Sequence, residues 1–157
     1  MRRMICLLLV ICCMASLCAC GSMNFSDISN STTKADIIKL LGDPTEIQDE
    51  EKWNKTTFVY PKGTVFYGIT TSEKLYVKFD RITEKLLLIT FNCDYEKENV
   101  KSFEALKGLV TKDYGEPFYE ETHYSGTAKL FWWQKDTDNS KLMEIFSDGT
   151  AYCCFNY

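Results

Sequence analysis

The chain has 157 residues, of which 45% are hydrophobic and 14% aromatic, and its formal net charge at neutral pH is −4. This composition is typical of one folded domain or two very small ones, and it excludes a disordered chain. The acidic balance, without a basic cluster, argues against binding to nucleic acid and against electrostatic docking on anionic lipid.

The N-terminal segment has the pattern of a signal peptide. Arg2 and Arg3 supply positive charge, and residues 4–17 form an apolar run without a charged side chain. This run is shorter than the roughly 20 apolar residues that span a bilayer. It ends in Leu17-Cys18-Ala19-Cys20-Gly21, which resembles the lipobox of bacterial lipoprotein precursors. The alternatives are an uncleaved anchor and a signal peptide without lipid.

The lipobox resemblance implies a location for the protein. It implies that a diacylglyceryl group is attached to the Cys20 thiol and that residues 1–19 are removed. Two or three acyl chains together hold a protein stably on a membrane, whereas a single chain does not. We therefore expect an extracytoplasmic protein, anchored to the bacterial cell membrane through the lipid on Cys20, or to the outer membrane if the source is Gram-negative. Residues 20–32, polar and without periodicity, are predicted to be a short tether.

Three cysteines remain as thiols once the leader is removed and Cys20 carries lipid. They are Cys93, Cys153 and Cys154. Adjacent strand residues point to opposite faces, so only one of Cys153 and Cys154 can share a face with Cys93. One interpretation is a disulfide from Cys93 to either of them; the other is buried reduced thiols. No metal site is predicted, because no CxxC pair or histidine cluster accompanies these cysteines.

Residues 33–98 are predicted to form a helix followed by strands. Thr33 and Asp36 fit a capping box, and the apolar positions that follow recur at helical spacing. Gly42 and Pro44 then end the helix. The strand patterns after it cover residues 56–60, 65–69, 74–80 and 86–91.

Residues 99–157 follow the same order. Apolar residues recur at helical spacing from Val100 to Val110, and the helix is predicted to end at Gly115, before Pro117. Short turns between the later strands favour an antiparallel meander. Its predicted strands are residues 118–123, 129–134, 141–146 and 150–157.

These similar halves predict an internal repeat. Leu41-Gly42-Asp43-Pro44 and Tyr114-Gly115-Glu116-Pro117 each follow a predicted helix and precede strands. The sequence therefore predicts an α+β fold of two tandem helix-plus-meander repeats, residues 33–98 and 99–157, with the helices packed on one face of the sheet. A helix followed by Leu-Gly-Asp-Pro-Thr also resembles the domains of small outer-membrane assembly lipoproteins and of tandem-repeat β-lactamase inhibitor proteins. The resemblance implies a protein-binding role and fixes no binding residue.

Motifs for catalysis are missing from the sequence. The one histidine, His123, lies at a predicted strand end. The chain has no Gly-x-Ser-x-Gly turn, no glycine-rich phosphate loop and no His-Glu-x-x-His pattern. We therefore expect a protein that is not an enzyme and uses no cofactor.

The aromatic residues of the strands are the candidate binding residues. Trp132 and Trp133 must point to opposite faces of their strand, so at most one of them can face a helix-covered core. The candidate binding face also includes Tyr67, Tyr76 and Tyr152, because large rings often anchor protein interfaces; the alternative is that these rings form the core. The predicted function is binding of another protein or envelope component. The alternative is a solute-binding or sensing lipoprotein with a small pocket between sheet and helix.

Overall fold

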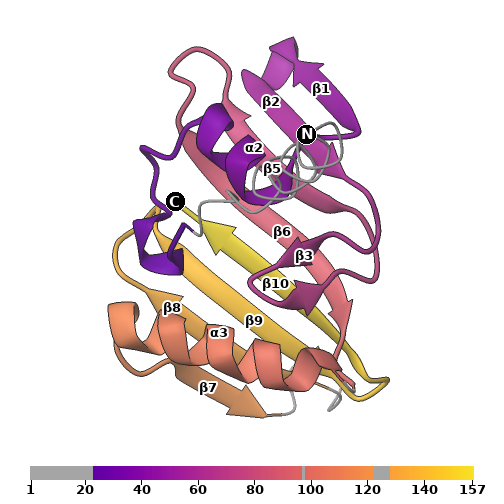
Figure 1. Cartoon of the computed structure of the whole chain (residues 1–157). Coiled ribbons are helices and arrows are strands. Elements are labelled where there is room, and N and C mark those ends of the chain that lie inside the picture. Colours follow the sequence, from indigo (N-terminus) through magenta and orange to yellow (C-terminus); the bar gives the residue numbers. More distant parts are fainter. Residues whose placement is uncertain (1–22, 97, 122–127) are drawn as a thin grey trace, which may run out of the picture.

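One antiparallel sheet dominates the computed structural model, which describes residues 23–96, 98–121 and 128–157 (Figure 1). The strand order across this eight-stranded sheet is β1-β2-β5-β6-β10-β9-β8-β7, and β3 and β4 form a separate hairpin. The strands are β1 (Glu46–Glu50), β2 (Lys55–Tyr60), β3 (Val65–Phe66), β4 (Ile69–Thr70), β5 (Leu75–Asp80), β6 (Leu86–Asp94), β7 (Phe118–Glu121), β8 (Ala128–Gln134), β9 (Ser140–Phe146) and β10 (Thr150–Asn156). The helical elements are η1 (Phe25–Asp27), α2 (Lys34–Leu41), η2 (Glu51–Trp53) and α3 (Glu98–Tyr114).

The predicted α+β fold of two tandem helix-plus-meander repeats is wrong, because the molecule is predominantly β, its strands form one continuous sheet, and the helices are only part of the layer on that sheet. Strands β6 and β10 pair antiparallel along their length, from Asp94 opposite Thr150 to Leu88 opposite Asn156. This pairing satisfies backbone groups that would otherwise form two exposed sheet edges. The helical part is small: α2 has 8 residues, α3 has 17, and the other two helical elements have 3 residues each.

Helix α2 begins and ends where the sequence predicts. The Asp36 N–H donates to Thr33 Oγ1 at 3.2 Å, and the Thr33 N–H donates to the Asp36 carboxylate at 3.1 Å. This capping box satisfies donors that the first helical turn leaves free. At the other end Gly42 has φ +82°, a conformation that glycine adopts without steric cost. The predicted start and stop signals are confirmed.

Helix α3 also matches its predicted pattern. Phe103, Leu106 and Val110 are buried at helical spacing, and the Gly115 N–H donates to Thr111 O at 2.8 Å just after the last turn. The helix therefore ends at the predicted glycine. Within the described residues, neither helix has the length and apolar content needed to cross a bilayer.

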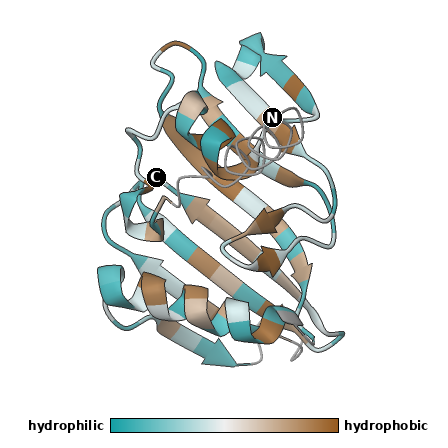
Figure 2. Cartoon of the chain, viewed as in Figure 1, coloured by the Kyte–Doolittle hydropathy of each residue, from teal (hydrophilic) through white to brown (hydrophobic). Residues whose placement is uncertain are grey.

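A layer of short elements covers one face of the sheet, which we call the covered face. In Figure 1, α2, α3 and the β3–β4 hairpin lie in front of the strands, and hydrophobic residues concentrate in the strands beneath them (Figure 2). On this face the register places one row of side chains across the sheet: Phe58, Val77, Ile89, Phe155, Lys141 and Trp133. The layer buries its own apolar residues in the same core: Phe25, Ile28, Ile37, Phe66, Ile69, Phe103, Leu106 and Val110.

The segment just before α2 packs on this core. The Phe25 ring lies edge-on to the rings of Tyr67 and Phe155, with centroids 5.5 and 5.4 Å apart, and Ile28 is buried beside it. The Tyr67 hydroxyl donates to Met23 O at 2.8 Å. From Met23 onward, the part of the chain predicted as a tether is therefore held on the covered face.

The β3–β4 hairpin replaces the single strand predicted for residues 65–69. Tyr67 and Gly68 have φ angles of +49° and +81°, which turn the chain back within two residues. A Cβ at Gly68 would lie 2.9 Å from Ser102 Oγ of α3, closer than side-chain carbons approach. The hairpin can pack on α3 because this position carries no side chain.

Replacing Gly68 with alanine should lower the free energy of unfolding by about 2 kcal/mol, from backbone strain at positive φ together with the clash on Ser102. Gly42→Ala is the matched control, since Gly42 has φ +82° with nothing within 4 Å of the added carbon. It should cost about 1 kcal/mol. Urea denaturation of both variants measures the difference, and equal losses would mean that the hairpin does not pack closely on α3.

Candidate functional site: the open face of the sheet

The face of the sheet opposite the covering layer carries no helix or hairpin among the described residues (Figure 1). The strand register places one row of side chains along it from β7 to β5, which we call the open-face row; the next member of the register, Val59 on β2, is buried. From β7 to β5 its members are Phe118, Trp132, Leu142, Cys154, Thr90 and Tyr76. These residues come from both halves of the chain, and the β6–β10 pairing makes them one surface.

The exposed apolar area of this face is concentrated at its β7–β8 edge. Phe118 and Trp132 are direct cross-strand partners and are 58% and 42% exposed. In the neighbouring row, Leu130 and Glu144 are each 8% exposed. Two large adjacent rings in water are typical of the anchor residues of protein interfaces.

The two tryptophans have opposite environments. Trp133 is 1% exposed and lies in the core on the covered face, where its ring stacks on Phe131 at a centroid distance of 6.3 Å. Trp132, its neighbour in the sequence, points out of the open face. Of the pair, only Trp132 is available to a partner.

The structure divides the three candidate tyrosines. Tyr76 belongs to the open-face row, and Tyr152 lies beside that row, where its hydroxyl oxygen accepts from Thr90 Oγ1 at 3.0 Å. Burial raises the pKa of Tyr152, so its hydroxyl stays neutral at physiological pH. Tyr67 lies on the covered face, bonded to Met23, and it is not part of this surface.

The cysteines also lie on both faces. Cys93 and Cys153 are fully buried on the covered face, Cys154 lies in the open-face row, and all three thiols are free. Burial raises the pKa of Cys93 to about 11 and also raises that of Cys153, so both are neutral thiols of low reactivity. Cys20 and His123 lie outside the described residues.

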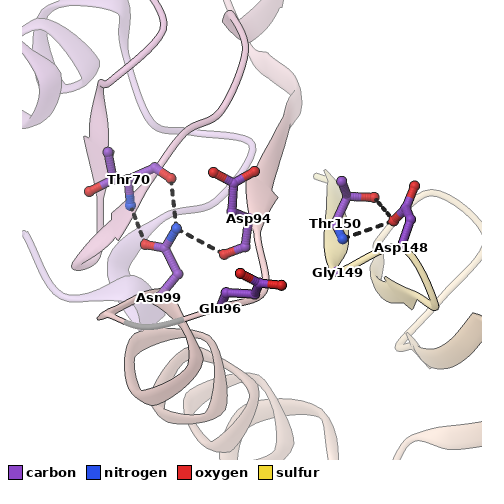
Figure 3. Close-up of a pocket in the computed structure, with 7 residues that line it drawn as sticks. All are labelled: Thr70, Asp94, Glu96, Asn99, Asp148, Gly149 and Thr150. Atoms are coloured by element: carbon purple, nitrogen blue, oxygen red, sulfur yellow. Dashed lines mark hydrogen bonds between the residues drawn. The ribbon is translucent and has the colours of Figure 1, made fainter.

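A polar pocket of about 500 Å³ opens where β4, α3 and the β9–β10 turn meet (Figure 3). The Asn99 amide accepts from Thr70 N–H at 2.9 Å and donates to Thr70 O and Asp94 O at 3.1 and 3.0 Å. Asp148 accepts from the N–H and hydroxyl of Thr150, which lowers the pKa of its carboxyl group. These bonds join α3 to β4 and close the β9–β10 turn. Among the described residues, no group of three His, Cys, Asp or Glu side chains could hold a metal ion.

No family model, curated protein or solved structure matches this chain. The likeness to lipoprotein and inhibitor domains therefore stays a prediction from sequence.

Two residues at the candidate sites, Phe118 and Lys141, are not distinguished by the sequence pattern. Phe118 lies in a predicted strand, but its place opposite Trp132 depends on the β7–β8 register. Lys141 also lies in a predicted strand, and the alternation between apolar and polar residues around it (Ser140-Lys141-Leu142-Met143-Glu144-Ile145) is irregular. Neither register nor the buried position of Lys141 could be read from such a pattern.

Proposed function

We propose that this protein is a membrane-anchored extracytoplasmic lipoprotein that binds another protein of the cell envelope through the open face of its sheet, without catalysis. The observation that carries the proposal is the exposed pair of Phe118 and Trp132, on a face that no described helix covers. A partner would remove both rings from water, and rings of this kind supply much of the affinity in protein interfaces.

The position of the N-terminal segment supports this orientation. Met23 is held on the covered face by Tyr67, and only two residues separate it from Cys20. Three residues of extended chain span at most about 10 Å. A lipid on Cys20 would thus keep the covered side close to the bilayer and leave the open face accessible to a protein.

A site-specific cross-link tests this proposal in native membranes. Benzoylphenylalanine at position 118 places the reactive ketone on the open face, and the same residue at Leu109, 43% exposed on α3, is the matched control. We expect a discrete protein adduct from position 118 and none of that size from position 109. Identical adducts from both positions, or lipid adducts alone from both, would contradict a protein-binding open face.

The anchor has a separate test. Replacing Cys20 with alanine should abolish acyl labelling and give an unprocessed precursor or a released protein, because the thiol that would carry the lipid is gone. Metabolic labelling with a fatty-acid analogue measures this result, and Cys154→Ala serves as the control that keeps its label. Undiminished labelling of the Cys20→Ala protein would refute the lipid anchor.

A further inference from the structure

Lys141 is the one charged side chain in the covered-face row, between Phe155 and Trp133. It is 1% exposed. Its Nζ donates to Asn139 Oδ1 at 3.1 Å and to Asn156 O, and it lies 3.5 Å from the centroid of the Tyr157 ring. The amine is therefore held at a fixed, buried place beneath the covering layer, between two asparagines and the Tyr157 ring.

This buried amine has no carboxylate partner among the described residues. No ion pair there includes Lys141, although buried lysines are rarely found without an anion nearby. Burial lowers the pKa of Lys141 to about 7, and electrostatic interactions with Cys154 and Asp136 raise it only in part. The charged form of Lys141 is held by Asn139, Asn156 and the Tyr157 ring, and a carboxylate against Nζ would add the direct ion pair that these neutral groups do not supply.

A cavity of about 290 Å³ lies beside Lys141, between η1, the end of α3 and the sheet. Its walls include the rings of Phe25, Tyr114 and Tyr157. At its polar end, two donors converge on one neutral oxygen, since Asn139 Oδ1 accepts from the Tyr114 hydroxyl at 2.6 Å and from Lys141 Nζ. The Tyr157 hydroxyl is buried and has no hydrogen-bond partner among the described residues.

We propose that this cavity binds a small organic carboxylate, whose anionic group lies against Lys141 Nζ and whose apolar or aromatic body packs on Tyr114, Tyr157 and Phe25. Such a ligand would pair the buried amine, and its body would pack on the three rings that line part of this largely polar cavity. The site is separate from the open face and goes beyond the proposed protein binding.

Several titratable groups would influence this binding. Asp113 and Lys135 line the cavity, and Asp136 acts on Lys141 from the β8–β9 loop. Tyr114 and Tyr157 have raised pKa values because they are buried, so both stay neutral below pH 9. An anion should bind best when Lys141 is protonated, and its affinity should fall as the pH rises above neutrality.

Titration calorimetry of the full chain with benzoate and benzamide tests the proposal at pH 6. The two probes have the same shape, and only benzoate carries charge. We expect benzoate to bind at least about tenfold more tightly than benzamide, and to bind more weakly at pH 9 than at pH 6. Equal affinity for both probes, or no saturable binding of benzoate, would overturn this proposal. Neither result would bear on protein binding through the open face.

Two variants locate the binding. Lys141→Met keeps a stem of similar length, and it should abolish the preference for benzoate over benzamide. Tyr114→Phe keeps the ring but removes the hydroxyl that fixes Asn139, a partner of the Lys141 amine, and it should therefore weaken benzoate binding several-fold. Lys129→Met, at an exposed lysine paired with Glu121 at 3.4 Å, is the control and should bind benzoate normally. Unchanged benzoate affinity in both Lys141→Met and Tyr114→Phe would show that the probe does not bind here.

Discussion

Replacing Trp133 with alanine should lower the free energy of unfolding by about 4 kcal/mol. Trp133 is 1% exposed and packs on Phe131 beneath the covering layer, so its removal leaves a cavity that the sheet cannot close. Truncating a large buried aromatic residue to alanine lowers the free energy of unfolding of a protein by about 3–5 kcal/mol. Urea denaturation with fitted slopes measures the loss.

Trp132→Ala is the matched control for that experiment. Trp132 is the adjacent residue, of the same type, and 42% exposed on the open face. The Trp132→Ala protein should lose less than about 1 kcal/mol of unfolding free energy, because much of the Trp132 ring is already in water. Similar losses for both variants would contradict the assignment of one face as core and the other as open.

Replacing Lys141 with methionine should raise the free energy of unfolding at pH 6 by about 2 kcal/mol. The folded protein holds the pKa of Lys141 at about 7 because burial disfavours the charged amine, whereas an unfolded lysine titrates near 10.4. Below pH 7 folding therefore has to bury a charge, and methionine removes that cost. Lost hydrogen bonds to Asn139 and Asn156 reduce the gain.

The sign of the pH dependence follows from the same shift. Between pH 7 and about 10 the unfolded chain binds a proton at Lys141 that the folded chain does not, so stability rises with pH by up to about 1.4 kcal/mol per unit. The advantage of Lys141→Met should therefore be largest at pH 6 and shrink above pH 7. Subtracting the two stability curves cancels the buried cysteines, whose raised pKa values act in the opposite direction. If the difference in unfolding free energy between the two proteins stayed constant from pH 6 to pH 9, the pKa of Lys141 would not be lowered in the folded state.

The sequence predicts the structure correctly where the interactions are between residues close together in the chain. The capping box of Thr33 and Asp36, the glycines that end α2 and α3, and the alternation in β5 depend on neighbours in the sequence. The pairing of β6 with β10 does not depend on sequence neighbours, because these strands lie far apart in the chain. The alternating patterns predicted that strands exist but not which edges meet, and the predicted fold class failed for that reason.

The candidate site shows the same limit. Alternation alone put Trp132 and Trp133 on opposite faces, but it could not say which of them faces the core. Tyr67 is not part of the open face, because a turn with positive φ places it on the covered face. The strand-like pattern of the surrounding residues gives no sign of this turn. Phe118 belongs to the open face through the β7–β8 register.

The binding affinity of the protein captured at position 118 tests the central claim most directly. With that protein in hand, calorimetry compares wild type, Trp132→Ala and the control Leu109→Ala. A docking surface centred on the open face predicts that Trp132→Ala weakens binding by about 30-fold or more while Leu109→Ala leaves it unchanged. Unchanged affinity for a folded Trp132→Ala protein would contradict the claim.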